Sequence, residues 1–557
     1  MSVFPTPWTE TYRSLGIGGL TLSNLPDLTL SDYVREHARR LGEREALVFL
    51  GQSLSYADLD RLADRFAGAL LASGCQPGEV LGIHLPNTPQ LVVALVAAAR
   101  IGVVVTCISP ITSAQECIAQ AQDARLKVLL TSDDALQTLV PTLVASVPSL
   151  SLVLLSTPTE LLADGPKAFS SAPIQQAHVH GFAALLQQAD PSPALPSHVP
   201  ADAVLYVMYT GGTTGMPKGA RLSSRNMLVT RAQLEPFFRL RDGAEIVASA
   251  FPVFHIGGLT VLLNALCTAS TFVLIPNPRD VEHLCDEMEK RPPTILAALP
   301  TLLQVLVTRP SFSALDFSAL RLVISGAAPL VESEVEKLEV VIGRGKICDV
   351  YGMTETAGVQ TINPSARFKP GFVGVPVPGT DVRVVNEAFE DVAAGEPGEI
   401  VVSGPQVMHS YVNTPEETRT ALQTIDGRVW VHTGDVGAFD GEGYLKIFDR
   451  SKDMLIVGGF KVFSVEVENQ LRDLPFIEGC ALVGRADLAR PGNDVVHLYV
   501  QRVAGDAVSQ EEREHELLAF CRASLAPYKV PKEIHFVDSL PLTRVGKVDK
   551  RALRSAR

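Results

Sequence analysis

Closely spaced cysteines are absent from this sequence. The eight cysteines are scattered, and no two of them form a Cys-x-x-Cys pair; they are Cys75, Cys107, Cys117, Cys267, Cys285, Cys348, Cys480 and Cys521. This scattering predicts neither a zinc site built on cysteine pairs nor a disulfide framework. It fits a protein of the reducing cytoplasm, and we expect that location.

An excess of positive charge is also missing. The formal net charge is −13 at pH 7, which argues against a nucleic-acid partner. The N-terminus does not offer the apolar core of a signal peptide, because Pro5, Pro7, Glu10 and Arg13 stand where that core would lie. The remaining composition is that of a globular protein.

An uninterrupted apolar run of membrane-spanning length is lacking as well. The one stretch that raises the question, Leu91–Ser109, contains Arg100 and Gly102 and is followed by a proline. We interpret it as a buried helix over Pro89–Ala99 that leads into a buried strand over Val103–Ile108.

Strand-like and helix-like segments alternate through most of the first 440 residues. Tyr56–Ser73 has the apolar spacing of an amphipathic helix, and Val80–Leu85 follows it as a strand. This alternation predicts a largely parallel sheet with helices on its faces, and 557 residues predict two or more domains. The pattern fades between about Ser156 and Pro200, where we expect a surface excursion without chemistry. A shift from acidic to near-neutral composition near Asp449 indicates a second unit.

One loop carries the strongest chemical signal. Tyr209-Thr210-Gly211-Gly212-Thr213-Thr214-Gly215-Met216-Pro217-Lys218-Gly219 follows an apolar run, Ala203–Met208, that is typical of a buried strand. Its backbone N–H groups, hydroxyls and single ammonium suit phosphate oxygens. It is not a Walker A loop, because Pro217 precedes the lysine and a glycine follows it. Nucleotide binding is the leading interpretation, and a flexible surface turn is the alternative.

Six further motifs follow that loop in a fixed order: Phe251–Gly258, Ser325–Pro329, Asp349–Thr356, His432–Asp435, Asp449–Asp453 and Pro541–Lys547. With the loop, they make the chain resemble the adenylate-forming superfamily over nearly its whole length. That superfamily includes acyl-CoA synthetases, adenylation domains of peptide synthetases and beetle luciferases. Within it, Pro7-Trp8 and the block Asp449–Glu468 look most like fatty-acyl-CoA ligases.

The resemblance implies an α/β fold class in two parts. A large N-terminal domain of several subdomains, with mostly parallel sheets, would span 1–448. A hinge would span 449–453, with Lys452 as its pivot, and a small mobile α+β domain would span 454–557. Rotation about the hinge would bring the two parts together in two different ways.

The resemblance also implies the reaction and its participants. A carboxylic acid would attack the α-phosphorus of ATP with Mg²⁺ present, and coenzyme A would then displace AMP from the acyl adenylate. Because the carboxylate and the phosphates of ATP are both anions, the site must supply positive charge and hydrogen bonds where they approach each other. The phosphates would be held by Thr210, Gly211, Gly212, Thr213, Thr214, Gly215 and Lys218, and the α-phosphate by Thr354. Glu355 would bind Mg²⁺, and Lys547 would bridge the attacking carboxylate and the ribose and α-phosphate oxygens.

Further residues are implied for the other parts of the substrates. The nucleoside would contact Gly326, Ala327, Ala328, Asp349, Tyr351, Gly352, Asp435 and Arg450. The acyl pocket would be edged by His255, Gly257 and Gly258, and coenzyme A would pass Gly458, Gly459, Phe460 and Lys461. Each assignment has a plainer alternative: a solvated carboxylate for Glu355, a core side chain for Tyr351 and for His255, a turn residue for Asp435, a surface ion pair for Arg450 and a tight turn for 458–461.

Three functions compete on the sequence alone. The leading hypothesis is an acid–CoA ligase for a medium- or long-chain fatty acid, with an aromatic or other acid as a variant. The second is an acyl-AMP ligase that loads a separate carrier protein. The third is a degenerate protein that only binds nucleotide or an acyl chain and catalyses nothing. The presence of Glu355, Asp435 and Lys547 argues against it. A lipid substrate leaves room for peripheral membrane contact, although no basic amphipathic anchor stands out.

Overall fold

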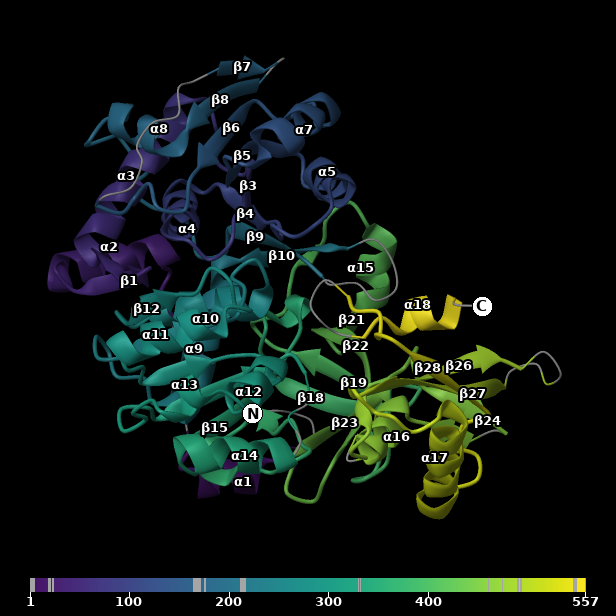
Figure 1. Ribbon diagram of the computed structural model, residues 1–557. Coiled ribbons are helices and arrows are strands. Elements are labelled where there is room, and N and C mark those ends of the chain that lie inside the picture. Colours follow the sequence, from purple (N-terminus) through teal and green to yellow (C-terminus); the bar gives the residue numbers. More distant parts are fainter. Residues whose placement is uncertain are drawn as a thin grey trace.

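The structure is a computed structural model that describes residues 6–18, 22, 25–163, 172–174, 177–210, 217–328, 330, 332–458, 460–472, 474–487, 490, 493–543 and 548–555. Two nine-stranded sheets form the larger part of the molecule, and a smaller part follows them in the chain (Figure 1). Both large sheets are mostly parallel, with helices packed on them, which confirms the predicted fold class.

The first large sheet carries the nucleoside-side motifs. Its strands run in the order β17 (Val375–Pro376), β16 (Thr361–Asn363), β15 (Ile347–Tyr351), β14 (Leu322–Gly326), β13 (Ile295–Ala297), β11 (Ile246–Ser249), β12 (Thr271–Leu274), β1 (Glu45–Phe49) and β2 (Gln52–Ser55). The helices of this part of the chain are α9 (Ser224–Phe238), α10 (Ile256–Cys267), α11 (Val281–Lys290), α12 (Pro300–Leu306), α13 (Pro310–Ser313) and α14 (Glu332–Ile342).

The second large sheet carries the glycine-rich loop. Its order is β20 (Ser410–Tyr411), β10 (Gly219–Ser223), β9 (Val204–Tyr209), β4 (Val104–Cys107), β3 (Val80–His84), β5 (Leu126–Ser132), β6 (Leu152–Ser156), β8 (Ala177–Gly181) and β7 (Ala172–Ile174). The helices that precede and accompany it in the chain are α1 (Thr9–Ser14), α2 (Leu30–Leu41), α3 (Tyr56–Ala72), α4 (Pro89–Ile101), α5 (Ala114–Asp123), α6 (Ala135–Thr138), α7 (Val140–Ser146) and α8 (Phe182–Gln188).

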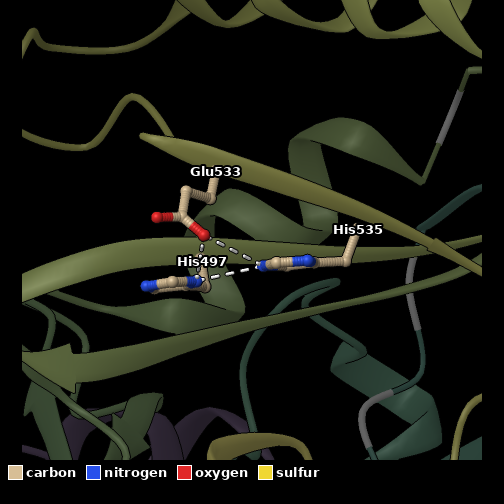
Figure 2. A group of neighbouring side chains, drawn as sticks. All are labelled: His497, Glu533 and His535. Carbon is tan, nitrogen blue, oxygen red and sulfur yellow. Dashed lines mark hydrogen bonds and ion pairs between the residues drawn. The ribbon is translucent and has the colours of Figure 1, made fainter. Parts of the chain in front are cut away.

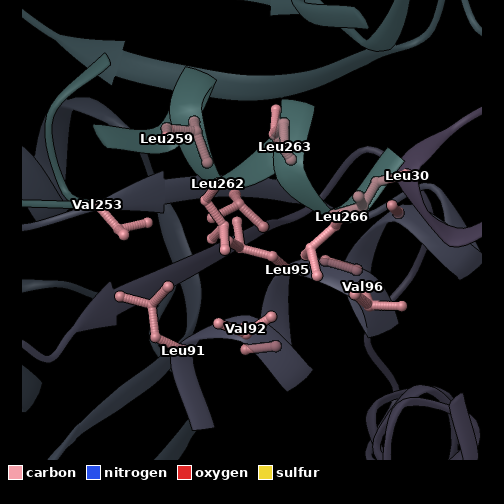
Figure 3. Close-up of a cluster of buried hydrophobic side chains, with 14 of the residues drawn as sticks. Leu30, Leu91, Val92, Leu95, Val96, Val253, Leu259, Leu262, Leu263 and Leu266 are labelled. Atoms are coloured by element: carbon pink, nitrogen blue, oxygen red, sulfur yellow. The ribbon is translucent and has the colours of Figure 1, made fainter. Parts of the chain in front are cut away.

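One apolar core joins the two large sheets. Helix α4 is buried along its whole length, and its leucines and valines face the leucines of α10, as Figure 3 shows. The sequence specifies α4 sharply, because a proline occupies its first turn and Gly102 ends it in a left-handed conformation (φ +72°). The predicted pairing of a buried helix with strand β4 is confirmed. Among the described residues, no helix combines the length and the apolar character needed to cross a membrane.

Two regions differ from the sequence-based expectation. The segment expected as a surface excursion contains β8, which pairs in parallel with β6 and extends the sheet, and α8, whose Phe182 is fully buried. Its strands are too short and too rich in alanine and histidine to stand out by periodicity. The alternation of strands and helices also stops before residue 440, because a five-stranded antiparallel sheet occupies 381–450.

That antiparallel sheet connects the two parts of the molecule. It comprises β18 (Asp381–Val385), β19 (Gly398–Ser403), β21 (Leu422–Ile425), β22 (Arg428–Phe439) and β23 (Leu445–Arg450), with α15 (Pro415–Ala421) beside it. The smaller part has its own apolar core. It contains β24 (Leu455–Val457), β25 (Phe460–Val462), α16 (Ser464–Leu471), β26 (Ile477–Ala486), β27 (Asp494–Arg502), α17 (Gln510–Ser524), β28 (Glu533–Val537) and α18 (Lys550–Ser555).

Candidate active site

The glycine-rich loop leaves the second sheet at the end of β9 and returns as β10. The backbone N–H of Thr210 donates to the Lys218 carbonyl over 2.9 Å, and the Lys218 N–H donates to the Thr210 hydroxyl oxygen over 3.3 Å. These two bonds close the base of the loop as an antiparallel hairpin. The predicted phosphate-binding residues Gly211, Gly212, Thr213, Thr214 and Gly215 lie outside the described residues.

A buried carboxylate lies near the ammonium at the base of the loop. Glu355 is 6% exposed and lies in a short 3-10 turn, Thr354–Thr356. Its carboxylate accepts a hydrogen bond from the hydroxyl of Tyr411, and the Lys218 Nζ lies 5.3 Å from the centre of that tyrosine ring. Thr354 is half-buried in the same turn. The structure therefore brings two predicted residues, Lys218 and Glu355, to one tyrosine, the first over its ring and the second at its hydroxyl.

The surroundings of Glu355 suit a hard cation with phosphate ligands. Burial raises the pKa of Glu355, while its hydrogen bond from Tyr411 and the charges of Arg450 and Lys218 oppose that shift. A single carboxylate flanked by cations is a poor metal cage by itself. It does fit Mg²⁺, which keeps waters and takes further oxygens from the phosphates of a nucleotide. Tyr411 was not among the residues predicted from sequence, because nothing in its local motif marks it.

The nucleoside-side residues meet across two sheets. The Tyr351 hydroxyl at the end of β15 donates to Asp435 Oδ2 over 2.5 Å, and Arg450 Nε lies 3.0 Å from Asp435 Oδ1. Asp435 and Arg450 are direct partners in the β22–β23 ladder. Burial, followed by the Asp435 charge, raises the pKa of Tyr351 well above its usual value. Three predicted residues that lie far apart in the sequence are thus joined by one hydrogen bond and one ion pair.

One oxygen of a second carboxyl group at this end, that of Asp349, lacks a partner. Asp349 on β15 is 5% exposed, and its Oδ1 accepts no hydrogen bond from the part of the chain that the structure describes. Burial raises the pKa of Asp349 to about 7. A buried polar atom without a partner is costly, and an amino group of a nucleobase would satisfy it. The carboxyl end of β15 therefore fits a nucleotide.

The backbone beside Asp349 is tightly constrained. A Cβ on Gly326 would lie 2.7 Å from the carbonyl oxygen of Val350, and one on Gly352 would lie 2.2 Å from that of Gly358. Ala327 has a left-handed backbone (φ +67°), which is uncommon for a residue other than glycine. Ala328 follows it and is half-buried. Strained backbone of this kind often marks a binding site.

The predicted acyl-pocket residues begin helix α10. His255 precedes its first residue, and its ring lies 5.1 Å from that of Phe254. A Cβ on Gly258 would lie 2.1 Å from the Pro252 carbonyl oxygen, whereas one on Gly257 would meet nothing within 4 Å. The Thr260 hydroxyl in the next turn donates over 2.9 Å to the carbonyl of Ala357, two residues beyond Glu355. The start of α10 thus adjoins the turn that holds Glu355.

The predicted hinge is held from both sides. Lys452 is exposed, and the Ser451 N–H donates over 2.9 Å to the carbonyl of Gly434 in the antiparallel sheet. Asp449, 3% exposed, accepts hydrogen bonds at Oδ2 from the Ser464 N–H over 2.5 Å and from the Ser464 hydroxyl over 2.6 Å. Ser464 begins α16 of the smaller part, so this carboxylate ties the two parts together across the hinge.

The predicted coenzyme A residues form an exposed hairpin, β24–β25. Gly458 has φ +60°, and its N–H donates over 2.7 Å to the side-chain oxygen of Asn493. Phe460 is 57% exposed and stacks on Tyr528 with ring centres 4.6 Å apart. Lys461 is exposed, and Gly459 lies outside the described residues. In Figure 1, β24 lies well away from β9 and β10.

Lys547 also lies outside the described residues, but the helix that follows it is well anchored. In α18, the Lys550 Nζ donates over 2.5 Å to the Ser464 hydroxyl oxygen and lies 2.7 Å from the carboxylate of Glu468. Arg554 pairs with Asp453 of the predicted hinge. These contacts anchor the start of α18, three residues beyond Lys547, on α16, and its last turn on Asp453 of the predicted hinge.

Comparisons with known proteins find relatives that match most of the chain. The family model for AMP-binding enzymes matches residues 34–412, and the model for the AMP-binding enzyme C-terminal domain matches residues 466–547. A long-chain-fatty-acid–CoA ligase of Bacillus subtilis (strain 168) is 33% identical over 546 residues, covering 95% of this chain and 94% of its own. A feruloyl-CoA synthase of an Amycolatopsis species is 34% identical over 509 residues, covering 90% and 94%. The crystal structure of ATP-bound MatB from Rhodopseudomonas palustris superposes with a TM-score of 0.80 at 27% identity, covering 95% and 98%.

Proposed function

Because this chain belongs to the AMP-binding enzyme family, we propose that it is an AMP-forming acid–CoA ligase. A carboxylate oxygen attacks the α-phosphorus of ATP, the bond to the β-phosphate oxygen breaks, and pyrophosphate leaves with its electron pair. The thiol sulfur of coenzyme A then attacks the acyl carbon, AMP leaves, and the thiol proton is released. The observation that carries this proposal is the set Tyr351–Asp435–Arg450, joined by a hydrogen bond and an ion pair, beside the Lys218–Tyr411–Glu355 set.

The residues of these two sets divide the work of the first step. Lys218 and the loop that it closes hold the β- and γ-phosphates, and Glu355 holds Mg²⁺, which when bound neutralises phosphate charge. Asp435 accepts hydrogen bonds from the ribose hydroxyls, with Arg450 fixing the orientation of its carboxylate. Asp349 accepts from the base. These contacts orient the α-phosphorus for attack and supply charge where the transition state needs it.

Lys547 completes the first step from the smaller domain. Its ammonium bridges the attacking carboxylate and the α-phosphate, so that two anions can approach. The anchoring of α18 on α16 and on Asp453 of the proposed hinge supports this role, since α18 begins three residues beyond Lys547. Lys547→Ala should slow adenylate formation far more than thioester formation from preformed acyl adenylate. Equal losses in the two steps would contradict the assignment.

The second step uses a different arrangement of two domains, 1–448 and 454–557, joined by a hinge at 449–453. In the proposal, the present arrangement serves adenylate formation, and the distance of β24 from β9 and β10 in Figure 1 supports this. Rotation about Lys452 then brings Gly458–Lys461 to the adenylate, where coenzyme A enters between that hairpin and the larger domain.

The acid is a medium- or long-chain fatty acid in this proposal. Identity with a long-chain-fatty-acid–CoA ligase supports it, while comparable identity with a feruloyl-CoA synthase makes an aromatic acid the second candidate. The test is release of AMP and pyrophosphate with acetate, octanoate, palmitate and ferulate, each with and without coenzyme A. Turnover with palmitate or octanoate and not with ferulate is expected. Absence of turnover with every acid at saturating ATP and coenzyme A would reject the ligase, and adenylate transfer to a phosphopantetheinylated carrier alone would identify a carrier-loading enzyme.

A further inference from the structure

Three side chains of the kinds that bind metal ions meet on the sheet of the smaller domain, and none of them is among the proposed nucleotide-binding residues. His497 lies on β27, and Glu533 and His535 lie on β28 (Figure 2). His497 Nδ1 is 3.0 Å from His535 Nε2 and 3.4 Å from Glu533 Oε2, and that oxygen is 3.6 Å from His535 Nε2. Within the described ranges, no other group of three His, Cys, Asp or Glu side chains brings its ligand atoms so close together.

The strand register produces this meeting. Strands β27 and β28 are parallel, with His497 opposite Glu533 and Tyr499 opposite His535. Side chains two positions apart share one face of a strand, so all four project from the same face of the sheet. The His535 ring stacks on Tyr499 with centres 4.5 Å apart, and the two imidazole planes are parallel to within 2°. The cluster is therefore held by backbone pairing and ring packing rather than by long flexible side chains.

We propose that His497, Glu533 and His535 bind a divalent ion of the zinc type. Ligand atoms about 2.0–2.1 Å from a tetrahedral zinc ion stand about 3.3 Å from one another. The three separations seen here lie on both sides of that value, so one ion can reach all three atoms with small side-chain adjustments. Two imidazoles with one carboxylate favour zinc over Mg²⁺, which prefers an all-oxygen set.

The surroundings of the cluster are compatible with metal entry. The Glu533 side chain is 57% exposed, so solvent reaches the cluster and can supply a fourth ligand. Burial is the main cause that lowers the pKa of His497, and a metal needs the neutral imidazole. The nearby Arg485 donates to the Tyr499 hydroxyl over 2.5 Å and to the carbonyl of Leu553 over 3.1 Å, so its charge is directed toward α18. A bound ion would cross-link β27 to β28.

The test is zinc binding by the full-length protein, expressed without a polyhistidine tag and freed of metal by chelation. Titration in competition with a chromogenic chelator should show one tight equivalent of Zn²⁺. Glu533→Gln and His535→Gln should each weaken that equivalent at least tenfold. His515→Gln, which removes an exposed histidine from α17 of the same domain, should leave it unchanged.

Cobalt provides an independent readout of the same site. Co²⁺ bound by the unmodified protein should show the intense visible absorption of a tetrahedral site, and Glu533→Gln should abolish it. Circular dichroism checks that each variant is folded, and the exposed Glu533 makes its replacement the safer variant. Absence of a saturable equivalent in the unmodified protein, or the same titration curve for all three variants, would overturn the proposal.

Discussion

Replacing Ser464 with alanine removes one of the two hydrogen bonds that join Asp449 to the smaller domain. Asp449 is the penultimate residue of strand β23, where it pairs with Val436 of the larger domain, and Ser464 begins α16. The proposed pivot, Lys452, lies between them in the chain. In the proposed rotation α16 moves away from β23, so both bonds to Asp449 would have to break before the second half-reaction.

The size of the effect follows from the type of bond. The Ser464 hydroxyl donates over 2.6 Å to a carboxylate that is 3% exposed. A hydrogen bond to a charged group contributes about 1.5–3 kcal/mol. Because about 1.4 kcal/mol corresponds to a factor of ten in an equilibrium constant, the observed arrangement should lose about 10- to 100-fold in population relative to the rotated one. Lys550 keeps its ion pair with Glu468 in the variant.

Two partial reactions measure this shift separately. ATP–pyrophosphate exchange reports adenylate formation, and thioester formation from synthetic acyl adenylate reports the second step. In Ser464→Ala the first should slow about tenfold or more, and the second should be unchanged or faster. Ser509→Ala is the matched control, since it removes a hydroxyl that caps α17 of the same domain, away from the hinge. Equal slowing of both steps, no slowing of either, or the same result with Ser509→Ala would refute the reasoning.

Three further outcomes are expected. Burial raises the pKa of Asp349 from 3.8 to about 7, so the native state retains a proton that the unfolded chain releases. The free energy of unfolding should therefore fall by up to about 1.4 kcal/mol per pH unit from about pH 4 to 7 and level off above. Urea unfolding of Asp349→Asn at several pH values should lack this slope. An identical slope in the variant would contradict the assignment. Glu355→Gln should slow adenylate formation about 10²- to 10³-fold without recovery at high Mg²⁺, and full activity in exchange assays would exclude Glu355 as the metal ligand. Gly258→Ala should destabilise the protein by about 1–3 kcal/mol, because its Cβ would lie 2.1 Å from the Pro252 carbonyl oxygen, while Gly257→Ala should leave the urea midpoint nearly unchanged; equal midpoints would refute the steric argument.

Local sequence patterns were sufficient for much of the larger domain. The helix predicted over Tyr56–Ser73 is α3, and its start is fixed by a Ser55–Asp58 capping box that any reader of the sequence can find. The apolar run at Leu91–Ser109 resolves into α4 and β4 because Gly102 breaks it. Periodicity failed where elements are short or antiparallel, as in β8 and in the sheet over 381–450, whose pairing depends on contacts far apart in the chain.

The site was predictable only as separate motifs. Nothing local to Tyr351, Asp435 or Arg450 indicates that the three share hydrogen bonds, and only the resemblance grouped them. Tyr411 was missed because its role comes from the pairing of β20 with β10, which brings it beside Glu355. The bond between Asp449 and Ser464 was equally invisible, since it depends on how the two domains pack. The roles of all the predicted site residues, those of the loop and Lys547 included, stay predictions.

The β22–β23 ribbon places Asp435 directly opposite Arg450, and the chain leaves the ribbon for the smaller domain just two residues before Lys452. The ion pair therefore lies only two residues along the chain from the proposed pivot. A large rotation of the smaller domain about that point would displace the ion pair little, whereas the end of the domain farthest from the pivot would move a long way. Under the proposed rotation, Asp435 would therefore keep its position against the ribose while the smaller domain presents a different surface to the site.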